Sequence, residues 1–291
     1  MKLEELIYKR FVDSAGLTRH LTVYSGLPAI FSPEAPDDSQ PGWDGRTLYP
    51  MVLYSFDMQA NQERKSAGVL SVSLLCQNMA PVTPEEIEPE VKKCLRDVLL
   101  LPDRGPAYAF AWARTDAFTM QEKKKDLVLG SEIRFDILEY ASQETTDPDP
   151  IMAMHQYVKA LSPDCVVIGH DRMEPITEAS GEAPVVYCRL LSVEKNRETN
   201  TVVWMDGRIA IHILCPDSEV RMKMAAAIAN QLSLEGEVIM LDKSPMFIKR
   251  LQVDYQADYL KSGQIFATVH YGLLRYKAKP HALQQAKGNY V

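Results

Sequence analysis

The sequence GVLSVSLLCQ (68–77) returns in altered form as GRIAIHILCP (207–216). The matched positions are apolar at every second residue and end in a cysteine: Leu70, Val72, Leu74 and Cys76 in the first stretch, Ile209, Ile211, Ile213 and Cys215 in the second. Side chains two residues apart share one face of a β-strand. The match therefore preserves the alternation of a strand as well as its composition, and it predicts a strand at both places.

A second pair of similar stretches closes each unit, SEIRFDILEY (131–140) and ATVHYGLLRY (267–276). The alignment pairs alternating apolar positions: Ile133, Phe135, Ile137 and Tyr140 with Val269, Tyr271, Leu273 and Tyr276. Counting back from these ends also matches Arg114 with Arg250 and Lys125 with Lys261. Two matched strands on either side of a helical stretch indicate an internal duplication.

The helical stretch of the first copy has a recognisable start. Thr83, Pro84 and Glu86 have the spacing of an N-cap, a first-position proline and a capping-box acid. Pro89 leaves two interpretations open, because an interior proline loses a backbone hydrogen bond: either the first turn is separate, or the main helix begins at Glu88 and Pro89. The expected apolar face is Val91, Cys94, Leu95, Val98 and Leu99, of which Val91, Leu95 and Leu99 match Met224, Ile228 and Leu232.

The chain divides at the polar stretch ASQETTDPDP (141–150), which has the composition of a linker. We predict a first module at 1–140, a second at 151–276, and a polar tail at 277–291 that is flexible or ordered by a partner. In each half the pattern indicates a helix, a strand, a β-hairpin, a helix and a second hairpin. The expected fold class is α+β: two tandem modules, each a mainly antiparallel sheet with helices packed on one face.

Composition narrows the class of protein. No apolar run approaches the roughly 20 residues that span a bilayer, and the charged first residues are unlike a secretory signal peptide. The five cysteines are odd in number and scattered, which favours buried thiols in a reducing compartment. A formal net charge of −7 argues against specific nucleic-acid binding.

Signatures of catalysis are missing from the sequence: it has no glycine-rich phosphate loop, HExxH, CxxC or GxSxG. We therefore expect no enzyme activity, no catalytic residues, no cofactor and no metal. Asp164, His170 and Asp171 are a minor metal-site alternative, since a loop could gather them. His212 and His270 are expected on outward-facing strand positions, and Cys76 and Cys215 as core-filling residues.

Candidate contact residues lie at two turns and one loop. Lys123, Lys124 and Lys125 occupy a hairpin tip, and Tyr259 and Lys261 occupy the equivalent tip of the second copy. Each tip is either a solvated turn or a contact with a neighbouring subunit. Trp43 and Tyr49, beside a Pro/Gly-rich loop, are candidates for docking because aromatic residues are enriched at interfaces.

The order of elements, with the closing pattern YLKSGQIFATVHYGLLRY (259–276), resembles the tail terminator (tail completion) proteins of long-tailed phages and phage-like contractile particles. In that family an α+β domain often ends in a polar hairpin, a glycine and an aromatic-rich strand, which Gly263, Phe266, Val269 and Tyr271 reproduce here. The resemblance covers most of Ile151–Tyr276, and Leu3–Tyr140 through the duplication. The duplication itself departs from the family, which usually has one module per chain.

The resemblance implies a structural role. Terminators form a ring, typically of six modules, that caps the tail tube and faces the neck or head. The expected partners are then further copies in a ring of three or six chains, the tail tube, sheath proteins and neck or head connectors. The expected location is a virion or phage-like particle assembled in the host cytoplasm. The alternatives are another neck, connector or baseplate adaptor, or an enzyme with a site between the two modules.

Overall fold

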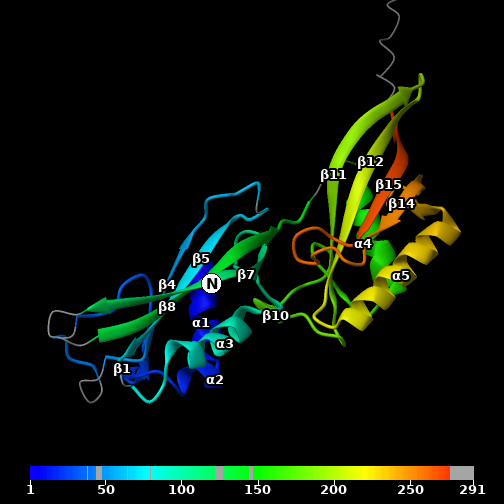
Figure 1. The fold of residues 1–291 in the computed structure, drawn as a ribbon. Helices are drawn as coiled ribbons and strands as arrows, with labels where there is room; N and C mark the ends of the chain where they lie inside the picture. The colour runs from blue at the N-terminus through cyan, green and yellow to red at the C-terminus, as the bar shows by residue number, and fades with distance from the viewer. Residues whose placement is uncertain are drawn as a thin grey trace, which may run out of the picture.

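The computed structural model describes residues 1–37, 39–43, 48–63, 65–78, 80–121, 127–143 and 147–275. Two separate, mainly antiparallel sheets, each with helices against it, form two halves of the described chain (Figure 1). We call residues 1–143 the first half and residues 147–275 the second half. This architecture confirms the α+β class.

The first sheet has the strand order β10-β6-β7-β8-β5-β4-β3. Its strands are β3 (Ile30–Phe31), β4 (Met51–Asp57), β5 (Gly68–Gln77), β6 (Val98–Leu100), β7 (Ala107–Gln121), β8 (Leu127–Tyr140) and β10 (Ile176–Glu178). The helices of this half are α1 (Leu3–Val12), α2 (Ala15–Thr18) and α3 (Pro84–Leu95), and a small ribbon pairs β1 (Val23–Tyr24) with β2 (Leu27–Pro28).

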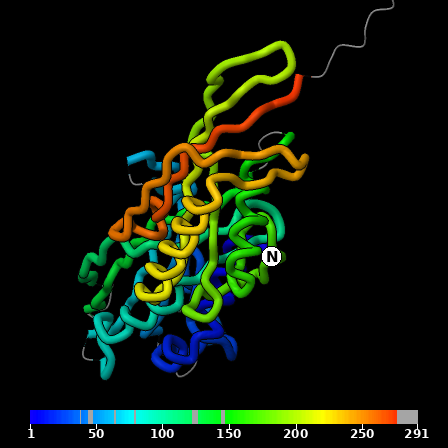
Figure 2. The backbone as a smooth tube through the Cα atoms, turned by 90° about the vertical axis from the view of Figure 1, so that its right-hand side faces the viewer, coloured from blue at the N-terminus to red at the C-terminus, as the bar shows by residue number. Residues whose placement is uncertain are grey.

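The second sheet has the order β13-β14-β15-β12-β11-β9. Its strands are β9 (Val166–Val167), β11 (Val185–Glu198), β12 (Val202–Leu214), β13 (Glu237–Ile239), β14 (Pro245–Val253) and β15 (Ile265–Leu274). The helices are α4 (Pro150–Leu161) and α5 (Ser218–Glu235), which lie against the same face of the sheet in Figure 2.

The two strand orders correspond position by position once β10 is set aside. In both sheets the strand at one end is short and runs parallel to its neighbour: β3 beside β4, and β9 beside β11. Val52 lies opposite Leu74 in the first sheet, and Val186 lies opposite Ile213 in the second. These pairs agree with the sequence alignment, which matches Leu74 with Ile213.

The alignment of the closing strands is wrong in register. Gly68 lies opposite Ile137 in the first sheet, whereas Gly207 lies opposite Val269 and not opposite Leu273, the residue matched to Ile137. The shift is an even number of residues, so the apolar side chains still face the helices. Alternation with a period of two specifies the face of a strand, but shifts by two or four residues satisfy it equally well.

Helix α3 settles the question raised by Pro89. It is one continuous helix from Pro84, with Pro89 inside it, and the carboxylate of Glu86 accepts a hydrogen bond from the Thr83 backbone N–H at 3.4 Å. The expected extension of its apolar face through Val98 and Leu99 is wrong, because both residues lie in β6. The chain turns out of the helix at Asp97, which adopts a left-handed φ of 56°.

Each half has a core between its helices and one sheet face. In the first half, helix side chains such as Phe11 and Val91 pack on alternating strand residues such as Val72 and Ile133. In the second half, α4 and α5 pack in the same way on β12 and β15. In the second half, Asp149 is the N-cap of α4 and directly precedes Pro150, and Asp217 is the N-cap of α5.

The two halves are joined by more than the connection at 141–150. Strand β10 leaves the second half and pairs antiparallel with β6 of the first sheet. The backbone N–H of Leu101 donates to the carbonyl of Pro175 at 2.8 Å, and that of Ala179 donates to the carbonyl of Asp97 at 2.9 Å. The first sheet is therefore completed by a segment of the second half.

Candidate interaction surfaces

The loop between β14 and β15 carries two of the predicted contact residues, Tyr259 and Lys261. The Tyr259 hydroxyl donates to Oδ1 of Asp97 at 2.6 Å, and Lys261 Nζ lies 2.8 Å from Oδ2 of Asp136. Both acids belong to the first half, against which the loop lies (Figure 1). Both side chains therefore contact the other half of their own chain, a partner that the sequence did not indicate, and their contact with a neighbouring subunit stays a prediction.

This contact between the halves is largely shielded from solvent. Asp136 is 2% exposed and Lys261 25% exposed, so their ion pair is shielded from most of the solvent. The Tyr259 ring also lies under the Arg221 guanidinium, 4.5 Å from the ring centre. Burial, together with Asp97, raises the pKa of the Tyr259 hydroxyl, so the tyrosine stays protonated and donates to the carboxylate.

An aromatic and aliphatic cluster fills the space between the halves; we call it the junction. The Tyr140 hydroxyl donates to the Leu260 carbonyl at 2.8 Å, and the Tyr187 hydroxyl donates to the Ala141 carbonyl at 2.9 Å. The two rings meet edge to face at 5.2 Å. Other junction residues come from both halves: Leu99, Ala107, Ala109, Leu138, Ile168, Ala179, Val185 and Leu214.

His212 belongs to this junction. It points away from the core of its own half, as the alternation of β12 predicts, but it is only 2% exposed because the junction covers it. Burial, followed by the charge of Arg189, lowers the pKa of its imidazole to about 4. His270 also alternates with core residues of its strand, as predicted, and like His212 it is buried, because other side chains cover this face of the sheet.

The remaining predicted contact residues have different outcomes. Lys123, Lys124 and Lys125 lie outside the described residues. Trp43 is half-buried, with its ring 4.9 Å from that of Tyr24. Tyr49 is 9% exposed and packs in the same small cluster, so the exposure on which its docking role was predicted is not observed.

The cysteines, and His170 and Asp171 of the alternative metal site, are engaged in packing, hydrogen bonds and ion pairs within the chain. All five thiols are free and buried, and burial raises the pKa of Cys76 to about 12 and also raises that of Cys215. Asp171 accepts from the Val167 N–H at 2.8 Å and pairs with Lys159 at 2.9 Å and His170 at 3.0 Å. Within the described residues, no group of three His, Cys, Asp or Glu side chains is arranged to hold a metal ion.

A pocket of about 370 Å³ opens beside the junction, lined by both halves. Its walls include Phe110, Trp112 and Leu260. Its charged groups are engaged with their neighbours: Arg96 pairs with Asp97 at 3.2 Å, and Lys92 Nζ lies 3.8 Å from the centre of the Trp112 ring. The pocket is therefore mainly aromatic and aliphatic, with its polar groups turned to each other.

A β-hairpin of β11 and β12 extends beyond the body of the second half; we call residues 191–206 the arm (Figure 2). Trp204 stacks on His270 at 4.9 Å, and His270 Nδ1 lies 2.6 Å from Oδ1 of Asp206. Asn196 donates to the other oxygen of Asp206 at 2.6 Å. This connected group links β11, β12 and β15 within the arm. Sequence reasoning missed it, although the alternation of Trp204 and Asp206 in β12 places both on one face.

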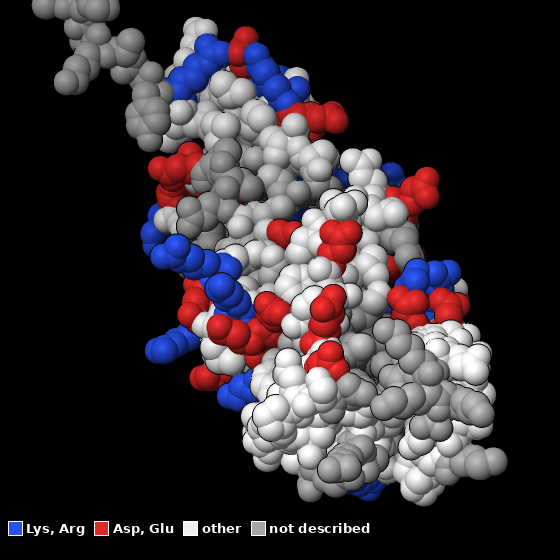
Figure 3. All heavy atoms as spheres, turned by 90° about the vertical axis from the view of Figure 1, so that its left-hand side faces the viewer, with Lys and Arg blue, Asp and Glu red and all other residues white. Residues whose placement is uncertain are grey.

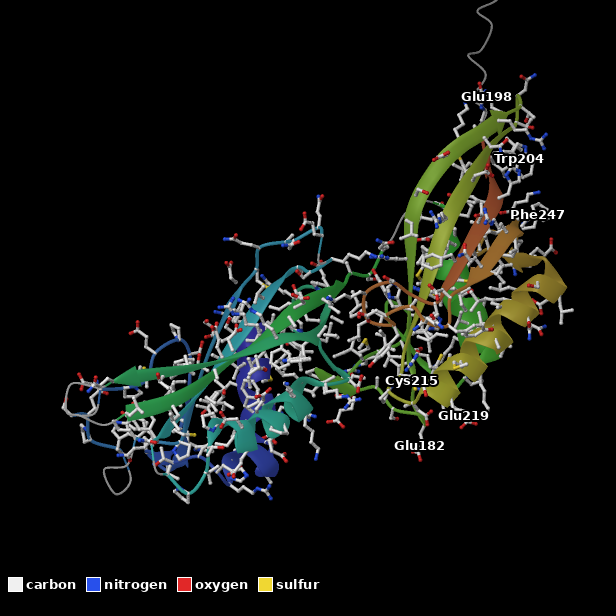
Figure 4. All side chains as sticks on the ribbon, viewed as in Figure 1. Glu182, Glu198, Trp204, Cys215, Glu219 and Phe247 are labelled. Atoms are coloured by element: carbon white, nitrogen blue, oxygen red, sulfur yellow. The ribbon has the colours of Figure 1, made fainter. Side chains whose placement is uncertain are left out.

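The sheet face away from α4 and α5 continues this surface with aromatic side chains. Figure 4 places Glu198 at the far end of the arm, with Trp204 between it and Phe247. Arg208 lies 5.7 Å from the Phe266 ring centre, and Lys249 lies 5.8 Å from that of Phe247. Paired aromatic and cationic groups of this kind suit protein contacts.

Three aliphatic side chains near the turn from α5 into β13 are exposed. Leu234 is 81% exposed, Ile239 54% and Leu241 51%. Gly236, in a left-handed conformation with φ 71°, makes the turn between them. We interpret these exposed aliphatic side chains as candidates for contact with a partner.

Charge is distributed unevenly on the face shown in Figure 3. Asp and Glu side chains gather across its middle, while Lys and Arg lie mainly toward its margins and its upper end. Within the described ranges, no helix combines the length and the apolar character needed to span a bilayer. Comparison with models of known protein families found no match, and neither did comparison with curated protein sequences.

Proposed function

We propose that this chain is a structural ring component that caps the tail tube of a phage or phage-like particle and joins it to the neck, head or terminal cap. One observation carries the proposal: two sheets in one chain have corresponding six-strand orders, with equivalent parallel end strands. We interpret them as two copies of one tail-terminator-like module, at 1–140 and 151–276. The sequence resemblance to tail terminators supports the same role.

The junction bears on how such a ring is built. Strand β10 and the Lys261–Asp136 ion pair connect the two modules directly. A rigid pair of similar modules can supply two adjacent positions of a ring, so three chains would give the six positions typical of terminators. In the alternative arrangement, six chains form the ring through one module each, and the other module decorates it.

Exposed surfaces of the second half are suited to the contacts that a ring component needs. The arm projects from the body, and the aliphatic group at Leu234, Ile239 and Leu241 lies in water in the isolated chain. An enzymatic function would need convergent polar groups between the modules. In the pocket beside the junction, Arg96 pairs with Asp97 and Lys92 lies over the Trp112 ring instead, so we favour the structural role.

Electron microscopy of assembled particles tests this function. The chain is co-expressed with a candidate tail-tube protein, and tube ends are imaged with and without the chain. We expect tubes of uniform length that end in a ring of added density. Tubes of variable length, whose ends carry no added density, would contradict the proposal. Density confined to the neck above the tube or to the baseplate would favour the adaptor alternative.

A further inference from the structure

A groove of about 670 Å³ lies between α1 and the segment at 30–36 that includes β3. Its floor contains the buried side chains of Ile30 and Tyr54, and its walls include Tyr8, Val12 and Phe31. Glu4 accepts a hydrogen bond from the Ser32 hydroxyl at 3.1 Å, which ties the helix to the opposite wall. The groove is thus an apolar, partly aromatic trough with defined walls.

The rim of this groove is acidic. Glu4, Glu5, Asp13 and Glu34 line it, and Lys9 is the one basic residue among the described lining residues. All four acids have exposed side chains, so their charges remain available to a ligand. The negative charge also reaches the floor: burial, and then Glu4, raises the pKa of the Tyr54 hydroxyl to about 12. An occupant of this groove should therefore be basic and should carry apolar side chains.

The chain contains one segment with this composition, YKAKPHALQQAKGNYV (276–291), which lies outside the described residues. It has three lysines and a histidine and no acid, and it includes Leu283 and Tyr290 as apolar side chains. We propose that the groove of one copy binds the 276–291 segment of a second copy, with lysines paired to the acidic rim and apolar residues on the Ile30 and Tyr54 floor.

The layout of the chain favours binding between copies. The described chain ends at Arg275, which pairs with Glu198 at the end of the arm. Figures 1 and 2 both show this end projecting from the second half, whereas α1 belongs to the first half. A contact from the end of one copy to α1 of the next is head-to-tail, and head-to-tail contacts close into rings or continue as open chains. The contact would serve the proposed ring, but the ring could also form through other surfaces.

Charge reversal on each side of the contact tests the proposal with the full-length chain. The groove variant is Asp13→Lys with Glu34→Lys, and Asp13 at the C-cap of α1 tolerates a positive charge. The segment variant is Lys279→Glu with Lys287→Glu. The matched control is Glu174→Lys with Glu182→Lys, two exposed acids of the second half. Sedimentation velocity measures self-association. At about 0.1 M salt, exposed charges more than about 10 Å apart are largely screened, so the measurement reports mainly on charges that face each other directly.

We expect both the groove variant and the segment variant to associate at least about tenfold more weakly than the control, since attraction becomes repulsion at each reversed charge. An equimolar mixture of the two variants should restore association. In that mixture, unlike copies meet through complementary charges, so a ring of six chains can close with the two variants alternating. A ring of three cannot alternate, and in that case the mixture should form open pairs that neither variant forms alone.

Three results would overturn the inference. The wild-type chain could remain monomeric at every concentration, in which case the segment does not join copies. Association could survive both reversals unchanged, which would leave the ring function standing but place its contact elsewhere. Finally, the mixture could remain as weak as the separate variants, which would show that the two sites do not meet.

Discussion

The ion pair between Lys261 and Asp136 gives the most direct test of how the two halves are held together. Lys261→Met keeps most of the side-chain volume and removes the charge that faces Asp136 at 2.8 Å. Breaking one side of a buried pair costs about 3–5 kcal/mol. Lys261 is 25% exposed, so water screens part of this interaction, and we expect a loss of about 2 kcal/mol in the free energy of unfolding.

Urea unfolding followed by circular dichroism measures that loss, with Lys249→Met, at an exposed position on β14, as the matched control. A double-mutant cycle with Asp136→Asn should give a coupling energy of at least about 1 kcal/mol between the two side chains. The reasoning is refuted if Lys261→Met unfolds together with the control and instead weakens the assembly of copies. That result would return Lys261 to the role of a subunit contact.

Three further predictions concern the junction, a thiol and two glycines. Burial lowers the pKa of His212 to about 4, so below about pH 6.5 the unfolded chain binds more protons than the folded chain. The free energy of unfolding of the wild type should therefore fall by about 3 kcal/mol relative to that of His212→Phe between pH 7 and pH 4. A difference between the two proteins that stays constant over this range would contradict the prediction. The thiol of Cys76, with its pKa raised to about 12, should react with iodoacetamide at pH 8 only after unfolding, and modification of Cys76 in the native protein, mapped by mass spectrometry, would show that it is accessible. Gly68→Ala should destabilise the chain more than Gly236→Ala, because a Cβ at Gly68 would lie 2.4 Å from the Asp57 carbonyl oxygen. A Cβ at Gly236 would meet open space, and only the φ of 71° would strain the backbone, at a cost of about 1 kcal/mol. If Gly236→Ala lowered the thermal midpoint more than Gly68→Ala, the predicted clash at Gly68 would be wrong.

Local features of the fold could be predicted from the sequence because short-range chemistry determines them. The alternation in 68–77 and 207–216 predicted β5 and the C-terminal part of β12. The spacing of Thr83, Pro84 and Glu86 predicted the start of α3. Registers were harder. The alignment of Ile137 with Leu273 kept the correct face and missed the pairing partner, because apolar alternation is unchanged by a shift of two or four residues.

The contacts between the halves could not be predicted because they join residues far apart in the sequence. Tyr259 and Lys261 lie in a polar loop, whose composition is the same whether water or another part of the chain surrounds it. His212 alternates out of its own core, and only the junction buries it. The α1 groove was missed for a similar reason, since its lining combines a helix face with a loop at 30–36.

Native mass spectrometry of the full-length chain tests the central claim, that two tandem modules work as a unit of a ring. The chain mass is 32.8 kDa. We predict a discrete species at three or six times that mass, stable across a dilution series. A chain that stays at its monomer mass at high concentration, alone and in the presence of purified tail tubes, would contradict the account.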